Sequence, residues 1–214
     1  MHRVVLVDDH RLIATTLTAS LRSAGLDVHW CAAPGPELDA LLDGPPGLAL
    51  LDLDLGEDAD GGRLDGVDLV RPIAAGGWTV VMITGATDEE RLADALAEGA
   101  IGWVHKNAAF DDLVAVCTSA AEGESILPLG ERRRLLARRR SRQADRKVYE
   151  DLLDRLTPRE REVLHALSEG SHVAEIASRS HVSVATVRSQ VQAIREKLEV
   201  ASQLEAAALY RATR

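Results

Sequence analysis

Two apolar runs in the first half of the chain end in carboxylates. Val4–Val7 leads into Asp8 and Asp9, and Leu48–Leu51 leads into Asp52. Such runs are typical of buried parallel strands, and open α/β sheets bind ligands at the carboxyl ends of their strands. Clustered carboxylates repel one another unless a divalent cation is present, and Mg²⁺ prefers oxygen ligands. We therefore expect these residues to form an acidic, cation-binding edge of a sheet.

The surrounding pattern alternates short apolar runs with segments of helical periodicity. The expected strands are 3–7, 26–31, 48–52, 78–84 and 100–105, and the expected helices are 10–24, 36–42, 65–73, 88–98 and 110–122. This alternation predicts an α/β fold with a doubly wound, five-stranded parallel sheet. Residues 56–64 are acidic and glycine-rich, and we expect a long loop there. Its acids, Glu57, Asp58 and Asp60, are expected to be solvated and not to bind metal.

The strand ends carry Asp8, Asp9, Asp52, Thr84 and Lys106. With this combination, residues 1–122 resemble the receiver domain of bacterial response regulators, which has a flavodoxin-like fold. The resemblance implies the strand order 2-1-3-4-5, which brings the four strands carrying these residues together at one cleft.

The resemblance also implies a role for each residue. Asp52 would be the nucleophile that accepts a phosphoryl group from a sensor histidine kinase. Mg²⁺ would be bound by Asp9, by Asp52 and by the backbone carbonyl of Asp54, with Asp8 acting through water. Lys106 would neutralise phosphoryl charge, Thr84 would donate its hydroxyl, and Trp103 occupies the aromatic switch position.

Several positions depart from the receiver pattern. The distance from Asp52 to Asp65-Gly66 is longer than usual, and Gly56 stands where a Met-Pro or Leu-Pro pair commonly lies. The long loop leaves open a regulator controlled by a ligand or partner without phosphorylation. A second alternative is an enzyme, because Asp52-Leu53-Asp54 also resembles the nucleophile loop of haloacid-dehalogenase-type phosphatases. That loop normally follows the first strand, so we favour a chain that catalyses at most its own phosphorylation and dephosphorylation.

An arginine-rich segment, residues 123–155, follows the first domain. Arg132-Arg133-Arg134 and Arg138-Arg139-Arg140 lie among good helix formers, and neither Gly nor Pro interrupts residues 131–156. The segment predicts one or two partly solvated linker helices. Contact with the DNA backbone and docking on the acidic first domain remain alternatives.

The third segment, residues 156–214, predicts an all-α domain. Thr157-Pro158 with Glu160 is typical of a capped helix start, and Ser183 caps a longer helix in which Val187, Val191 and Ile194 form an apolar stripe. Leu156–Leu164, Ala174–Ala177 and Thr186–Arg188 look like a LuxR-type helix-turn-helix domain, which makes the whole chain similar to the NarL/FixJ family.

This second resemblance implies double-stranded promoter DNA as a partner and a homodimer when active. Arg188, Ser189 and Gln192 would face bases, and Thr186, Arg195 and Lys197 would face phosphates. Arg and Gln form bidentate contacts with guanine and adenine, respectively. Glu199 replaces a glycine that is common after the recognition helix.

Composition agrees with a two-domain DNA-binding protein. Residues 1–120 contain 7 Lys and Arg against 20 Asp and Glu, and residues 121–214 contain 18 against 14, so their net charges are −13 and +4. Only the second half is therefore expected to approach a polyanion. Cys31 and Cys117 form no disulfide framework or metal-ligand spacing. No apolar run is long enough to span a membrane and no signal peptide is evident, so we expect a cytoplasmic protein without a membrane partner.

Overall fold

The computed structural model describes residues 2–58, 60–85 and 87–213. The chain divides into two compact units, Met1–Arg139 and Arg140–Arg214. Among the described helices, none combines the length and the apolar character that crossing a lipid bilayer requires.

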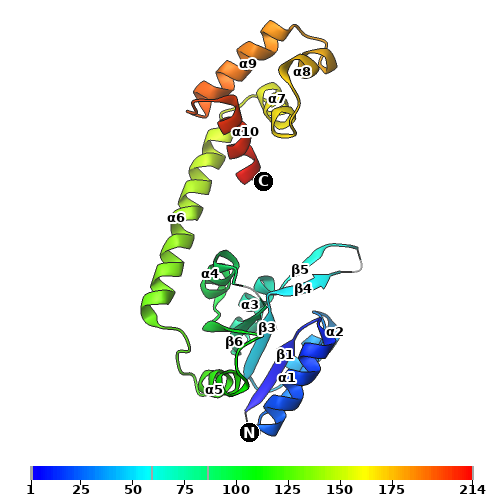
Figure 1. Cartoon of the computed structure of the whole chain (residues 1–214), viewed down its shortest axis with the longest axis vertical. Coiled ribbons are helices and arrows are strands. Elements are labelled where there is room, and N and C mark those ends of the chain that lie inside the picture. The colour runs from blue at the N-terminus through cyan, green and yellow to red at the C-terminus, as the bar shows by residue number, and fades with distance from the viewer. Residues whose placement is uncertain (1, 59, 86, 214) are drawn as a thin grey trace. The chain divides into compact units, whose positions relative to one another are not determined.

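The first unit is built on a five-stranded parallel sheet with the order β2-β1-β3-β6-β7. This is the order that the receiver resemblance implied, and Figure 1 shows the sheet enclosed by helices. The strands are β1 (Arg3–Val7), β2 (Asp27–Cys31), β3 (Leu48–Asp52), β6 (Thr79–Thr84) and β7 (Gly102–His105). Every residue of the central strand β3 is buried, as expected for a strand covered on both faces.

Two helical layers cover the sheet. The helices of this unit are α1 (Arg11–Ser23), α2 (Pro36–Leu42), α3 (Gly66–Ala75), α4 (Glu89–Glu98) and α5 (Phe110–Ala121). Successive strand residues point to opposite faces, so Val5 and Val7 pack with α2, α3 and α4, and Val4 and Leu6 pack with α1 and α5. The alternating pattern of the sequence is thus confirmed as two apolar cores on either side of one sheet.

The prediction of a loop at residues 56–64 was wrong in part. Asp54–Glu57 (β4) and Arg63–Asp65 (β5) pair antiparallel and form a two-stranded ribbon outside the main sheet. Figure 1 shows this ribbon extending away from the sheet. Glu57, Asp58 and Asp60 are exposed, and Ala59 lies outside the described residues.

The linker prediction left one or two helices open, and the structure has one, α6 (Leu129–Asp154). The division between the two units falls within it. Its last turns carry Leu152 and Leu153, which are buried in the core of the second unit.

The second unit contains the predicted helix-turn-helix arrangement. Its helices are α7 (Pro158–Ser168), α8 (Val173–Arg179), α9 (Val184–Lys197) and α10 (Gln203–Ala212). The capping box of Thr157 and Glu160 and the Ser183 cap are both present. Helix α8 begins after His172, whose backbone N–H donates to the Glu175 carboxylate.

Both cysteines are free and buried. Burial raises the pKa of the Cys31 thiol to about 11, with a smaller contribution from Glu37. Burial alone raises the pKa of the Cys117 thiol to about 12. Both therefore pack as small apolar side chains.

Candidate functional site

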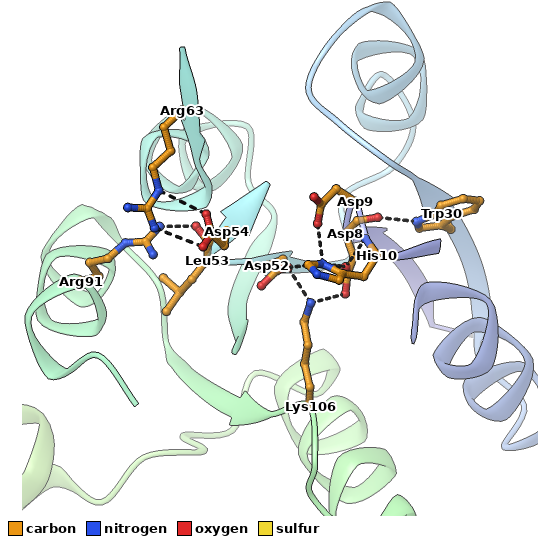
Figure 2. Close-up of polar contacts among 10 residues, drawn as sticks. All are labelled: Asp8, Asp9, His10, Trp30, Asp52, Leu53, Asp54, Arg63, Arg91 and Lys106. Carbon is orange, nitrogen blue, oxygen red and sulfur yellow. Dashed lines mark hydrogen bonds and ion pairs between the residues drawn. The ribbon is translucent and has the colours of Figure 1, made fainter. Parts of the chain in front are cut away.

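The predicted acidic residues meet at the carboxyl end of the sheet. Asp8 follows β1, Asp52 ends β3, and Lys106 follows β7; Asp8 and Asp52 are buried at 0% and 3% exposure. The Lys106 Nζ lies 2.5 Å from Asp52 Oδ2 and 2.7 Å from Asp8 Oδ2. Figure 2 shows the Lys106 side chain reaching both carboxylates. The ends of β1, β3 and β7, which are not consecutive in the chain, thus bring these three side chains into contact.

Backbone hydrogen bonds fix these side chains in place. The Lys106 N–H donates to the Thr84 carbonyl at 2.8 Å, and the Leu53 N–H donates to the Ile83 carbonyl at 3.1 Å. The indole Nε1 of Trp30 on β2 donates to the Asp8 carbonyl at 2.9 Å. The parallel register therefore holds the positions on which the site depends.

His10 belongs to the same cluster, although its type and spacing did not single it out. Its ring Nδ1 lies 2.7 Å from Asp9 Oδ1 and 3.8 Å from Asp52 Oδ2. Its backbone N–H donates to Asp8 Oδ1 at 2.8 Å. Asp8, Asp9, His10 and Asp52 each offer one ligand atom, and these atoms all lie within 4.8 Å of one another. Its position directly after the Asp8-Asp9 pair was the only available signal.

Burial and charge act in opposite directions on the two central groups. Burial raises the pKa of Asp52, Lys106 opposes this, and the neighbouring Asp8 charge adds to the rise. Burial lowers the pKa of Lys106, but its hydrogen bonds to Asp52 and Asp8 outweigh this, so the net pKa shift is upward. The ammonium group therefore stays charged and stabilises the carboxylates.

The donor set fits a hard divalent cation. Asp8, Asp9 and Asp52 supply oxygen ligands, and one ammonium group does not balance three carboxylates. Gly56 leaves room beside them, because a Cβ at this position would lie 2.9 Å from Asp9 Oδ2. Gly56 also has φ +75°, which a glycine adopts without strain. The glycine that departs from the receiver pattern thus permits a close approach of β4 to the acidic edge.

Thr84 lies on β6, which pairs with β3, and Trp103 lies on β7, which pairs with β6 on its other side. Thr84 ends β6 and is buried, and its register partner on β7 is His105. Trp103 on β7 is half-buried and packs against the apolar clusters that contain Leu92, Ala93 and Leu96 of α4. The structure therefore brings Thr84 to the acidic edge and places Trp103 one strand away.

The Asp54 side chain points away from the cluster. Its carboxylate accepts two hydrogen bonds from Arg63 across the β4–β5 ribbon, Nε–Oδ1 at 3.2 Å and Nη2–Oδ2 at 3.1 Å. The Asp54 carboxylate is thus turned away from the cluster, and the resemblance assigns the metal contact to the backbone carbonyl of Asp54. Beside it, Arg91 of α4 donates to the Leu53 carbonyl (Figure 2). Arg91 also donates to the Asp65 carboxylate. No sequence pattern pointed to Arg91.

The predicted DNA-facing residues lie along α9. Val187 and Ile194 are buried in the core of the second unit, so the opposite side of α9 is solvent-exposed. The exposed side carries Thr186, Arg188, Ser189, Gln192 and Arg195. A cavity of about 530 Å³ is lined in part by Arg188, Gln192 and Arg195.

Some of these polar groups already have partners within the unit. Lys197 is half-buried, and its Nζ lies 2.7 Å from Glu160 Oε2 of α7. Arg195 donates to the Ala201 carbonyl, and Gln192 donates to Glu196 at 3.0 Å. Lys197 therefore contributes to the packing of α9 on α7, whereas Arg188 has no hydrogen-bond or ion-pair partner among the described residues.

Two family models match the chain. The response regulator receiver domain matches residues 4–118, and the bacterial regulatory proteins of the luxR family match residues 154–210. The nitrate/nitrite response regulator NarL of Escherichia coli strain K12 is 31% identical over 208 residues, covering 95% of this chain and 92% of NarL. The response regulator VraR of Staphylococcus epidermidis is 29% identical over 209 residues, covering 95% and 93%.

Solved structures of the response regulator RcsB share the fold. RcsB of Salmonella typhimurium superposes with a TM-score of 0.51 at 24% identity, and the match covers 98% of both chains. A structure of two RcsB dimers bound to two parallel DNAs superposes with a TM-score of 0.52 at 21% identity, covering 100% of this chain and 99% of that chain.

Proposed function

The chain belongs to the NarL/FixJ family of bacterial response regulators, and we propose that it controls transcription by accepting a phosphoryl group on Asp52. The observation that supports this choice is the position of Asp52. Its buried carboxylate ends the central strand and lies 2.5 Å from the ammonium group of Lys106. Asp8 and Asp9 stand beside it at the same edge of the sheet.

The proposed step is a transfer from a phosphohistidine of a sensor histidine kinase. A carboxylate oxygen of Asp52 forms a bond to phosphorus as the N–P bond breaks, and the electron pair of that bond returns to the kinase imidazole. Mg²⁺, held by Asp9, Asp52 and the backbone carbonyl of Asp54, with Asp8 acting through water, would neutralise charge on the phosphoryl oxygens. Lys106 contributes the second positive charge.

The transferred group then biases a two-state equilibrium. Changing a ratio of 1:99 into 99:1 requires about 5.5 kcal/mol of differential binding. Hydrogen bonds to charged groups contribute about 1.5–3 kcal/mol each. Two or three such bonds, with the Thr84 hydroxyl and the Lys106 ammonium as donors, suffice to favour a state in which Thr84 and Trp103 move inward.

The second domain supplies the output. We propose that residues 156–214 bind promoter DNA as a homodimer, with Arg188, Ser189 and Gln192 at bases and Thr186, Arg195 and Lys197 near phosphates. RcsB dimers bound to DNA support the dimeric mode. The proposed receiver is residues 1–122, joined by the helical linker 123–155, in a cytoplasmic protein whose only catalysis is its own phosphorylation and dephosphorylation.

The direct test uses a small phosphodonor on the full chain. With Mg²⁺ and acetyl phosphate, we expect one phosphoryl group per chain by intact-protein mass spectrometry and none on Asp52→Asn. Asp54→Asn is the matched control, because it keeps the backbone carbonyl and changes only an exposed side chain; it should retain the label. A label that survives Asp52→Asn would contradict the assignment.

The same experiment separates the two alternatives. A wild-type chain that takes no label but binds DNA would favour control by a ligand or partner. Steady turnover of a phosphomonoester would favour a dehalogenase-type phosphatase. The position of Asp52 on the third strand of the chain, not the first, argues against the phosphatase.

A further inference from the structure

Arg91 of α4 places its guanidinium on the backbone that follows the phosphoacceptor. Its Nη2 donates to the carbonyl of Leu53, the residue after Asp52 (Figure 2). The Arg91 side chain is only 20% exposed, so water and salt screen this contact little. A hydrogen bond from a charged donor is stronger than one between neutral groups. The peptide unit that joins Leu53 to Asp54 is therefore held by a strong donor at its carbonyl.

Asp65 fixes the guanidinium from the other side. Arg91 Nη2 lies 2.7 Å from Asp65 Oδ1, and Arg91 Nε lies 3.2 Å from Asp65 Oδ2. Two parallel hydrogen bonds of this kind fix the plane of a guanidinium group. Asp65 is itself held in place, because its Oδ1 accepts the N–H of Val67 at 2.9 Å as the N-cap of α3. The position of Arg91 thus depends on the start of α3 as well as on Leu53.

The backbone of Leu53 is also held by its neighbours. The Gly66 N–H donates to the Leu53 carbonyl at 3.0 Å, and the Leu53 N–H donates to the Ile83 carbonyl of β6 at 3.1 Å. A Cβ at Gly66 would lie 1.8 Å from the Asp52 carbonyl oxygen, so only glycine lets α3 begin this close to β3. The Leu53 carbonyl therefore accepts two hydrogen bonds, one from the backbone and one from Arg91.

The other end of the same peptide unit faces Asp52. The peptide is trans, and because a peptide unit is planar, the Leu53 carbonyl and the Asp54 N–H point in opposite directions along one rigid plane. Burial is the main cause that raises the pKa of Asp52, and a hydrogen bond from the Asp54 N–H to its carboxylate lowers it. A donor on the carbonyl also polarises the peptide and strengthens its N–H as a donor. Arg91 and the Asp52 carboxylate thus lie at the two ends of one peptide unit.

We propose that Arg91 is a positioning residue for phosphoryl transfer, which fixes the Leu53–Asp54 peptide so that the Asp54 N–H holds the Asp52 carboxylate in its reactive orientation. This inference rests on the proposed function. A fixed N–H restrains rotation of the carboxylate about its Cβ–Cγ bond, and a misplaced nucleophile lowers the rate even in an intact fold. The Asp54 carbonyl belongs to the next peptide unit, so the same restraint limits its position.

Arg132 offers a matched control for a purely structural role of Arg91. Its guanidinium donates to backbone carbonyls near the amino end of β7, far from the carboxyl ends of the strands. The acceptors are Leu96, Ala100 and Ile101, at 3.5, 3.2 and 3.3 Å. Arg132→Ala removes an arginine–carbonyl contact from the same unit, as Arg91→Ala does. Both changes should destabilise the unit, but only Arg91→Ala should alter the groups around Asp52.

Amide resonances of the full chain test the contact without phosphorylation. In EDTA, where no cation competes for the Asp52 carboxylate, we expect the Asp54 amide proton of the wild type to resonate downfield, because it donates to a charged acceptor. Arg91→Ala should move this resonance upfield, and Arg132→Ala should leave it in place. Arg91→Lys keeps a charged donor for the Leu53 carbonyl and should retain most of the downfield shift.

Labelling by acetyl phosphate, followed by intact-protein mass spectrometry, tests the effect on transfer. Mg²⁺ is titrated to saturation for each variant. Arg91→Ala should take up the phosphoryl group at least about tenfold more slowly than the wild type, which corresponds to about 1.4 kcal/mol. Arg91→Lys should stay within about threefold of the wild type, since its ammonium can donate to the carbonyl although it lacks the paired donors of a guanidinium. Arg132→Ala should stay within about twofold.

The outcomes are distinguishable. Either an unmoved Asp54 resonance in Arg91→Ala or equal labelling rates in Arg91→Ala and Arg132→Ala would overturn the positioning role and leave the proposed function intact. Arg91→Met keeps the apolar stem and loses every donor, so it replaces the alanine variant if circular dichroism shows that variant unfolded. A wild-type chain that takes no label on Asp52 overturns the proposed function and the positioning role together.

Discussion

Lys106 is the residue on which the electrostatics of the acidic edge depend. Its side chain is 6% exposed and contacts two carboxylates that are themselves buried. A buried pair stabilises little relative to apolar residues, but removing one partner leaves an uncompensated buried charge. The ammonium group is therefore needed for stability as well as for the proposed phosphoryl chemistry.

We expect Lys106→Met to lower the free energy of unfolding of the first unit by about 3–5 kcal/mol in EDTA. Mg²⁺ should recover part of this loss, because a cation can balance the same carboxylates. All three tryptophans lie at or before residue 103, so urea unfolding followed by tryptophan fluorescence reports on this unit. Lys147→Met, at an exposed position of α6, should change stability by less than about 0.5 kcal/mol. Equal stability of the two variants would show that Lys106 is not the counter-charge.

Glu199 shows why a glycine is common after the recognition helix. Its φ is +58°, in the left-handed region that costs a non-glycine residue about 1–2 kcal/mol. Its side chain pairs with Arg155, with Nη1 and Oε1 3.2 Å apart, and this exposed ion pair contributes little to stability.

Glu199→Gly should therefore raise the stability of the second unit by about 1 kcal/mol. The matched variant Glu196→Gly, three residues earlier in the last turn of α9, should lower it by up to about 1 kcal/mol, because glycine loses more backbone entropy than glutamate in a helical conformation. Chemical denaturation followed by circular dichroism measures both. The same sign for the two changes would be inconsistent with backbone strain at Glu199.

At the scale of elements, α4 and the β4–β5 ribbon are held by contacts of different strength. Arg91 of α4 is largely buried and combines a carbonyl and a carboxylate, whereas the Arg63–Asp54 pair of the ribbon is exposed on both sides. Exposed pairs contribute little because water and salt screen them. Hydrogen bonds made by a charged group inside the fold contribute more.

Arg91→Ala should therefore lower the stability of the first unit by about 1.5–3 kcal/mol, and Arg63→Ala by less than about 1 kcal/mol. Urea unfolding monitored by tryptophan fluorescence compares the two directly. A ribbon that is a rigid part of the site would reverse the order, with the larger loss in Arg63→Ala.

A carboxylate at the start of α7 makes the stability of the second unit depend on pH. Burial opposes ionisation of Glu160, but hydrogen bonds from Lys197 and Thr157 outweigh it, so the pKa of Glu160 is lowered. Because its pKa is lowered in the fold, Glu160 stabilises the second unit at pH values above the ordinary pKa of glutamate. This stabilisation is lost as the pH falls through the lowered pKa.

At neutral pH, Glu160→Gln should lower the stability of the second unit by about 0.5–1 kcal/mol, because the glutamine keeps the capping contact to the Thr157 N–H and loses only the ion pair with Lys197. The difference from the wild type should shrink at acid pH. Glu160→Ala, which also loses the cap, should cost about 1 kcal/mol more at neutral pH. Denaturation curves from circular dichroism across this pH range check both; a constant difference would exclude the ion pair.

The elements that the sequence predicted well are those with strong local signals. Apolar runs, helix caps and glycine stops are local features, and the order of the sheet followed from the receiver resemblance. The β4–β5 ribbon escaped prediction because Gly56, Gly61 and Gly62 are typical of a loop, and its pairing depends on contacts across the segment. His10 and Arg91 escaped because only the folded chain brings them to their carboxylate partners.

At the scale of the whole molecule, charge is divided between the two halves. The acidic first half and the basic second half favour approach to DNA by the second half alone. From the sequence, the arginines of α6 were expected to be partly solvated, and DNA contact and docking on the first domain were the alternatives, because the pattern is compatible with all three. The structure pairs those of the first half with α4.

DNA binding should depend on Arg188 without affecting folding. On DNA selected from a random pool, Arg188→Ala should weaken binding by about 1–3 kcal/mol and relax base preference at one position, with unchanged unfolding. Arg159→Ala removes an exposed pair with Glu162 on α7 and should bind as the wild type does. Fluorescence anisotropy at several salt concentrations measures both, and a uniform loss on all sequences would assign Arg188 to phosphate contact.

The burial of both native thiols makes the chain ready for site-specific labelling. Cys31 and Cys117 are enclosed by the two apolar cores and ionise only in alkaline solution, so maleimides at neutral pH should leave them unmodified. A cysteine introduced at any exposed position would then be the sole reactive handle. Spin labels or dyes can thus be attached at chosen points without first replacing a native residue.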